Sequence, residues 1–105
     1  MITSGTGKHQ VNLEKQRIGD HLLFVVQGGE KPHIGAVIIC EPEKDAVIST
    51  LGSHKDHIVL TPLAKKACEK YQTTVVVTGG IHIDHASQKD IDLVIKNCKR
   101  LESCI

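Results

Sequence analysis

Aromatic side chains are nearly absent from this chain of 105 residues, which has one phenylalanine, one tyrosine and no tryptophan. Phe24 and Tyr71 are also far apart in the sequence. Because aromatic rings supply the stacking contacts around planar ligands, this scarcity excludes a site that grips a flat ring tightly between aromatic side chains. Affinity for such a ligand has to come from another part of it, such as an anionic end.

A surplus of charge and long apolar runs are missing as well. The 13 basic and 12 acidic residues give a formal net charge of +1 at pH 7. This is not the excess of positive charge that is typical of proteins that bind nucleic acid or an anionic membrane. No apolar stretch approaches the roughly 18 residues of a membrane span, and residues 1–10 lack the apolar segment of a signal peptide. We therefore expect a cytoplasmic protein that binds neither nucleic acid nor membrane.

The four cysteines are widely spaced, and no Cys-x-x-Cys pair occurs. This spacing argues against a zinc ribbon or a thioredoxin-type redox motif. Cys40, Cys68 and Cys98 fall on apolar faces of predicted elements, so we interpret them as small buried side chains. Cys104 lies beyond the last apolar stripe.

Length and composition predict one domain with a single core, since 40% of the residues are hydrophobic. The polar start predicts a flexible N-terminal tail over residues 1–8, followed by one folded domain over residues 9–105. A domain this small buries a limited fraction of its surface, and its sheet has edges that another subunit can cover. We therefore expect a homodimer.

Five segments have the alternating or continuous apolar pattern of strands. Gly19 and Asp20 form a two-residue hairpin signal between the first two. The third has an unbroken apolar run, as in a strand buried on both faces. The segments are QVNLEKQRI (10–18), HLLFVVQGG (21–29), IGAVIICE (34–41), DAVISTLG (45–52) and TTVVVTGG (73–80).

Two helices complete the predicted fold. Thr61 and Pro62 are typical of a cap and a first turn, and an apolar stripe follows them to Tyr71. Ser87 begins the second helix with a Ser-x-x-Asp pattern that resembles a capping box. Its apolar stripe contains Ile91, Val94, Ile95, Cys98 and Leu101. The order ββββαβα predicts an α+β fold, a mixed five-stranded sheet with both helices packed on one face.

Chain direction brings three loops to one rim of this sheet. The third and fourth strands are joined by a short turn and run antiparallel, whereas the fourth and fifth are joined through a helix and run parallel. Loops 28–35, 52–59 and 79–87 therefore emerge together, and the N-termini of both helices open beside them. Five of the seven histidines lie in these loops: His33, His54, His57, His82 and His85.

This convergence predicts a divalent metal site. Imidazole is the commonest neutral ligand for such ions, and three rings from separate loops can define one face of a coordination sphere. Asp56 and Asp84 can ligate the metal or orient the histidines, although acidic residues also favour the approach to a helix N-terminus. A single loop histidine is more often a solvated or capping residue, so the simpler interpretation stays open for each ring. The predicted ligands are His33, His54, His82 and Asp84.

The same rim suits an anionic ligand such as a phosphate. Lys55 can neutralise its charge, Gly79 and Gly80 permit a close approach of the backbone, and Ser87 begins a helix whose N–H groups attract anions. Each of the four also has a simpler interpretation as an exposed lysine, an ordinary strand end or a plain cap.

Three stretches together resemble a known family. "KPHIGAVII", "GSHKD" and "VVVTGGIHID" are similar to segments of the prenylated-flavin chaperones, the small D-type accessory proteins of gallate-type decarboxylases. The resemblance covers roughly residues 19–101. His33, His54, His82 and Asp84 match the family's motifs, whereas His57 and His85 match them less well.

The resemblance implies a fold similar to proteasome-assembly chaperones, a homodimer, and a carrier that holds prenylated FMN for delivery to a decarboxylase apoenzyme. A metal facing the flavin phosphate, with Lys55 and a helix N-terminus nearby, would hold the anionic tail and leave the ring accessible. Two alternatives remain: a metal-dependent hydrolase that uses three histidines to activate water, and a protein-interaction module without a ligand.

Overall fold

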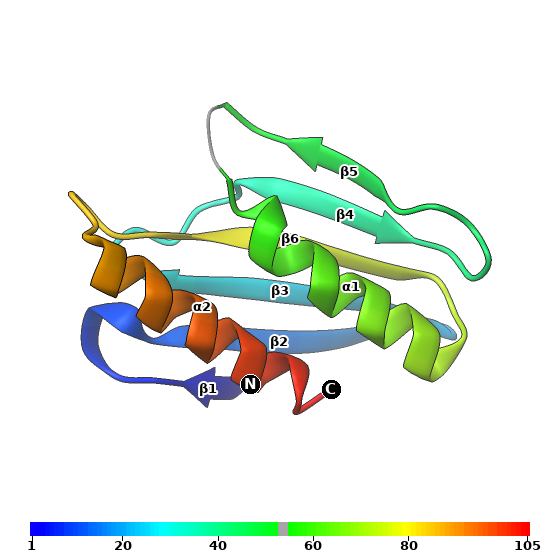
Figure 1. Ribbon diagram of the computed structural model, residues 1–105. Coiled ribbons are helices and arrows are strands. Elements are labelled where there is room, and N and C mark those ends of the chain that lie inside the picture. Colours follow the sequence, from blue (N-terminus) through cyan, green and yellow to red (C-terminus); the bar gives the residue numbers. More distant parts are fainter. Residues whose placement is uncertain (53–54) are drawn as a thin grey trace.

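The computed structural model describes residues 1–52 and 55–105, and the molecule has two layers. A six-stranded mixed sheet forms one layer, and both α-helices lie on the same face of it (Figure 1). The predicted α+β architecture is confirmed. No helix in the described ranges is long and apolar enough to cross a membrane. The elements are β1 (Ile2–Ser4), the 3₁₀ turn η1 (Gly7–His9), β2 (Val11–Ile18), β3 (His21–Gly29), β4 (Ala36–Cys40), β5 (Val47–Thr50), α1 (His57–Tyr71), β6 (Val75–His82) and α2 (Gln88–Glu102).

The strand order is β1-β2-β3-β6-β4-β5. The last strand, β6, is therefore inserted between two earlier ones, parallel to β3 and antiparallel to β4. Because β5 is also antiparallel to β4, β5 and β6 run in the same direction, as predicted. This insertion puts the end of β6 at the centre of the rim.

The N-terminal residues correct two predictions. Residues 1–8 were expected to be a flexible tail, but Ile2–Ser4 form β1, which pairs antiparallel with β2, and η1 follows. The sheet consequently has six strands instead of five. A three-residue strand is too short to produce an alternating pattern, so its pairing depends on tertiary contacts that the local sequence does not reveal.

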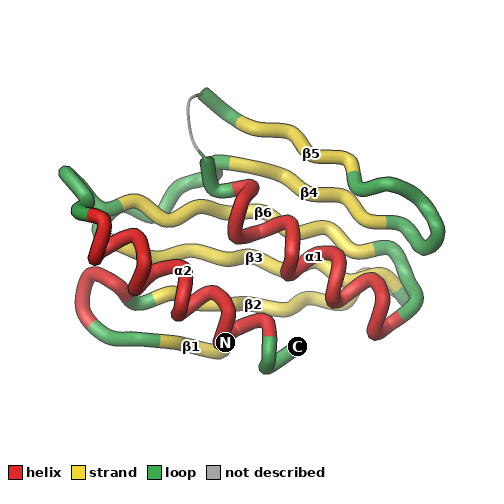
Figure 2. Tube along the Cα trace, in the orientation of Figure 1, coloured by secondary structure: helices red, strands yellow, loops and turns green. Residues whose placement is uncertain are grey.

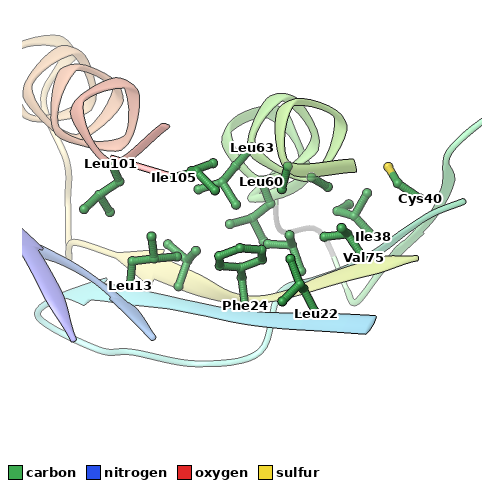
Figure 3. Close-up of a cluster of buried hydrophobic side chains, with 14 of the residues drawn as sticks. Leu13, Leu22, Phe24, Ile38, Cys40, Leu60, Leu63, Val75, Leu101 and Ile105 are labelled. Atoms are coloured by element: carbon green, nitrogen blue, oxygen red, sulfur yellow. The ribbon is translucent and has the colours of Figure 1, made fainter. Parts of the chain in front are cut away.

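The core lies between the sheet and the helices. Side chains alternate along each strand, and the set that faces the helices is almost fully buried, as Leu22, Phe24 and Val26 of β3 are. Leu60 and Leu63 of α1 pack onto this set, as Figure 3 shows. These contacts hold α1 firmly to the sheet.

The cysteine predictions are confirmed, since Cys40, Cys68 and Cys98 are buried and Cys104 is exposed. Burial raises the pKa of the Cys98 thiol to about 12. These three side chains act as small apolar groups.

The start of α1 differs from the prediction. The helix begins at His57, with Asp56 at its N-cap, and Pro62 lies inside it. A proline removes the hydrogen bond to the carbonyl four residues earlier, and its ring crowds that carbonyl. Here that carbonyl belongs to the first turn of the helix, so the effect is confined to its start. Thr61, the predicted cap, has a buried hydroxyl without a hydrogen-bond partner in the described part of the chain. The Thr-Pro signal therefore lies about one turn inside the helix.

The start of α2 agrees with the prediction. Ser87 is its N-cap, and Oγ of Ser87 accepts a hydrogen bond from the Asp90 N–H at 3.1 Å. In return, the Ser87 N–H donates to the Asp90 carboxylate at 2.9 Å. This capping box fixes where the loop after β6 ends.

Candidate functional site

The three loops predicted to share one rim do so over the residues that the structure describes. The last residue of β3, Gly29, pairs with His82 at the end of β6, and Ala36 at the start of β4 pairs with Gly79. Figure 2 shows the connecting loops at the same end of the strands. His54, with Ser53, lies outside the described residues.

A buried carboxylate joins these loops. One oxygen of Asp56 accepts a hydrogen bond from the Ile81 N–H at 2.9 Å, and the other lies 3.0 Å from Nε2 of His33. Only 8% of the Asp56 side chain is exposed, so both contacts offset the cost of burying it. The start of α1, the end of β6 and the loop before β4 are therefore tied together at one side chain.

Both ring nitrogens of His33 face oxygen acceptors. Nε2 faces the Asp56 carboxylate, and Nδ1 lies 3.1 Å from the carbonyl oxygen of Lys31. A carboxylate and a carbonyl only accept hydrogen bonds, so the ring serves here as a donor. A metal, in contrast, requires a nitrogen lone pair. In this arrangement Asp56 orients His33, which is one of the two roles foreseen for that aspartate.

A second pair lies on the surface of the rim. Nε2 of His82 is 2.9 Å from the carboxylate of Asp84, and Nζ of Lys31 is 3.1 Å from the same group. The Lys31 ammonium, followed by the His82 ring, holds the pKa of the Asp84 carboxyl below its usual range. The carboxylate of Glu30 accepts a hydrogen bond from the Asp84 N–H at 3.0 Å. Asp84 is therefore fixed between two loops and stays ionised.

The two oriented rings lie close to one another. The centroids of His33 and His82 are 6.2 Å apart, in an edge-to-face arrangement. Both rings line a small cavity of 330 Å³ together with Lys31, Pro32 and Ile34. The rim thus presents two histidines to the same space.

The described residues do not by themselves form the predicted metal site. Among them, no three histidine, cysteine, aspartate or glutamate side chains are placed to hold one ion. His33 and His82 each direct Nε2 at a carboxylate, and His54 is outside the described residues. His57 is the first residue of α1 and His85 is exposed in the loop before α2. The metal stays a prediction.

A larger groove opens on the helix side of the rim. It has a volume of 510 Å³ and lies between the first turn of α1, the first half of α2 and the end of β6. Its walls are mainly aliphatic, and the polar residues that line it within the described ranges are Lys55, Asp56 and His82. Such a size and lining are typical of small-molecule sites. The aliphatic residues are Ile58, Val59, Ile81, Ile83, Ala86, Ile91, Val94 and Ile95.

The apolar stripe of α2 predicted a buried helix face and did not reveal this groove. In the structure Ile91 is 43% exposed, and Val94 and Ile95 are only half-buried. The length of this apolar stripe could have indicated the groove, because it places more apolar side chains on α2 than the contact of the helix with the sheet can bury. The surplus side chains form one wall of the groove.

The four residues predicted to contact a cofactor have different positions. Lys55 lines the groove, and Ser87 is engaged in the capping box. Gly79 has a φ of +135°, and an added Cβ would lie 1.7 Å from the carbonyl oxygen of Val26. A Cβ on Gly80 would lie 2.7 Å from the His33 ring. Both glycines thus accommodate the protein's own atoms, and ligand contact by Gly79, Gly80 and Ser87 stays a prediction.

Two comparisons with known proteins concern nearly the whole chain. Residues 5–104 match the family model of the prenylated flavin chaperone LpdD-like domain. The chain is also 32% identical over 95 residues to Protein LpdD of Lactiplantibacillus plantarum, an alignment that covers 86% of this chain and 70% of that protein.

Proposed function

Because the chain belongs to the prenylated flavin chaperone LpdD-like family, we propose that it holds prenylated FMN and delivers it to a decarboxylase apoenzyme that depends on this cofactor. Family membership makes the protein a chaperone, which removes the metal-dependent hydrolase from the alternatives. The observation that carries the proposal is the aliphatic groove of 510 Å³ at the rim.

The groove suits the apolar part of such a ligand. A ring system extended by a prenyl-derived ring presents a broad apolar surface, and Ile81, Ile91 and Ile95 offer aliphatic contacts to it. The two aromatic residues give no stacking there, because Phe24 is 1% exposed in the core and Tyr71 ends α1 at the far end of the helix. Contacts of this kind favour a carrier, which has to release its ligand to the acceptor.

The phosphate end belongs beside Lys55. Lys55 is exposed, lines the groove and directly precedes the N-cap of α1, so its ammonium is available to an anionic group of the ligand. The N-terminus of α2 is less suitable, because the Asp90 carboxylate already occupies it. An FMN phosphate and Lys55 therefore form the proposed polar contact.

A divalent metal beside the phosphate is a separate part of the proposal, and it depends on His54. If His33, His54 and His82 hold the ion, purified wild-type protein contains metal and His82→Ala loses it. His21 lies at the opposite end of the sheet, where its neighbour Leu22 pairs with Val75, so His21→Ala is the control and keeps the metal. If metal-free wild-type protein binds the flavin, the proposed metal is refuted and the proposed carrier role is unaffected.

We also propose a homodimer formed through the face of the sheet opposite the helices. Leu23, Val76, Ile39 and Val47 are register neighbours on four adjacent strands and form an apolar row across that face. No helix or strand in the described ranges covers it (Figure 1). A self-complementary apolar surface of this kind suits two copies related by a two-fold axis.

Light scattering at micromolar concentration tests the dimer. The wild type is expected at twice the monomer mass, and Val76→Lys at the monomer mass, because the new charge would have to be buried in the interface. A monomeric wild type would rule the dimer out.

A transfer assay tests the carrier role itself. The protein is loaded with prenylated FMN, separated from free ligand and mixed with a decarboxylase apoenzyme, and the recovery of decarboxylase activity is followed. We expect faster recovery than with the same concentration of free cofactor. A wild type that binds neither prenylated FMN nor FMN would support the interaction module without a ligand instead.

A further inference from the structure

The two halves of α2 are held in different ways. Its buried residues, Asn97, Cys98 and Leu101, all lie in the second half. The first half, which lines the groove, has no buried side chain. Packing against the core therefore fixes the second half. The first half reaches the core through the half-buried Val94, so the position of the groove wall depends more on other contacts.

One such contact comes from the N-terminal segment. Nε2 of His9 lies 2.7 Å from one carboxylate oxygen of Asp90, in the first turn of α2. The side chains are 23% and 14% exposed, respectively, so the contact is partly shielded from water. The second carboxylate oxygen of Asp90 accepts the Ser87 N–H of the capping box. A single carboxylate thus joins η1 to the helix start that forms the groove wall.

The same segment also holds α2 through its middle. Nδ2 of Asn97 donates to the carbonyl oxygen of His9 at 2.8 Å, and Oγ of Ser4 donates to the Asn97 side chain at 3.4 Å. A Cβ on Gly5 would lie 2.2 Å from Nδ2 of Asn97, so the segment passes directly against the helix. Residues 4–9 therefore contact α2 at Asn97 and at Asp90. In the first half of the helix, Nζ of Lys8 also lies 3.6 Å from the Asp90 carboxylate, but His9 makes the shorter contact, at 2.7 Å.

We propose that His9 is a positioning residue for the flavin groove: its hydrogen bond to Asp90 holds the first half of α2 at the distance from α1 that the ligand requires. This inference rests on the proposed function, because it takes the groove as the flavin site. It gives the N-terminal segment, which contributes no residue to the groove lining, an indirect part in binding.

Three variants test this role. His9→Ala removes the hydrogen bond, and His9→Gln keeps a side-chain N–H that can donate to Asp90. His21→Ala removes an exposed histidine at the opposite end of the sheet. Each is titrated with prenylated FMN, and amide hydrogen exchange is compared between residues 88–95 and residues 98–102.

We expect His9→Ala to bind the flavin about fivefold more weakly, the equivalent of one ordinary hydrogen bond. Exchange should be faster in residues 88–95 and unchanged in residues 98–102. His9→Gln should restore both properties, and His21→Ala should match the wild type.

Three results would overturn the inference. They are wild-type affinity in His9→Ala, failure of His9→Gln to restore binding, and an equal rise of exchange in both halves of α2, which would indicate a general loss of stability. A wild type without flavin affinity would instead refute the proposed function, and the exchange comparison would still decide whether His9 holds the first half of α2.

Discussion

The two helices lie on the same face of the sheet but bury very different numbers of apolar side chains. The buried residues of α1 are Leu60, Leu63, Ala64, Ala67 and Cys68, spread along most of its length. In α2 the buried residues begin only at Asn97. One helix is packed over most of its length, and the other mainly at its C-terminal half, with the half-buried Val94 as a further core contact.

This difference explains why the groove lies where it does. The buried side chains of α1 fill the space beneath most of that helix, whereas the first half of α2 leaves Ile91, Val94 and Ile95 partly accessible beside the end of β6. The stability of the fold therefore depends mostly on the packed residues of α1, whereas the first half of α2 contributes mainly to the groove. Substitutions in α1 and α2 should separate the two properties.

The largest expected effect is on stability, from Leu63→Ala in α1. Leu63 is 2% exposed, and loss of a buried leucine side chain typically costs about 2–5 kcal/mol. Leu93→Ala makes the same change on α2, where the side chain is only half-buried, and should cost clearly less. Urea unfolding monitored by circular dichroism measures both, and equal losses would contradict the contrast between the helices.

Cys98→Ser changes the packed half of α2. A poorly paired buried hydroxyl in place of the thiol should lower the free energy of unfolding by about 1–3 kcal/mol, without a change in flavin affinity. In the folded wild type, a thiol reagent should modify the exposed Cys104 quickly and Cys98 slowly, because its raised pKa and burial keep Cys98 protonated and covered. Rapid modification of Cys98 would show that this half is not packed.

Ser87→Ala tests the start of α2. The variant loses the side-chain half of the capping box, and loss of such a cap typically costs about 1 kcal/mol. Unfolding by urea measures this loss. An unchanged free energy of unfolding would mean that this cap does not stabilise the start of α2.

The smallest effect is the pH dependence of the His9–Asp90 contact. The hydrogen bond from His9, followed by that from the Ser87 backbone, holds the pKa of the Asp90 carboxyl well below its usual range. A carboxyl with a lowered folded-state pKa stabilises the protein above its unfolded pKa of about 3.9, and this stabilisation is lost as the pH falls through the folded value.

Asp90→Asn should therefore be less stable than the wild type at pH 7, and the difference should shrink as the pH falls below about 4. Thermal unfolding from pH 7 down to pH 3 measures it. A difference that stays constant over this range would show that the ionised carboxylate is not what stabilises the start of α2.

Local patterns predicted most of the fold. The hairpin at Gly19 and Asp20, the five longer strands and the capping box at Ser87 each have a signature within a few residues. The strand β1 and the true start of α1 do not, because three residues are too few for a pattern and Pro62 imitates a first turn.

The candidate site was predictable only in part. Strand direction brought His33 and His82 to one rim, and Asp56 and Asp84 do orient histidines. The local sequence did not reveal that Asp56 pairs with His33 from another loop. Nor did it reveal the groove, because the exposure of the apolar stripe of α2 depends on which of its side chains the tertiary packing covers.

The most direct test of the groove as the flavin site compares two isoleucines of similar exposure. Ile91 lines the groove and is 43% exposed, whereas Ile18 is 58% exposed at the opposite end of the sheet. Prenylated FMN is titrated against the wild type, Ile91→Asp and Ile18→Asp, with absorbance as the measure of binding. We predict that Ile91→Asp weakens binding by about tenfold or more, because a charge would face the apolar part of the ligand, and that Ile18→Asp binds like the wild type. Equal affinity of Ile91→Asp and the wild type would contradict the account.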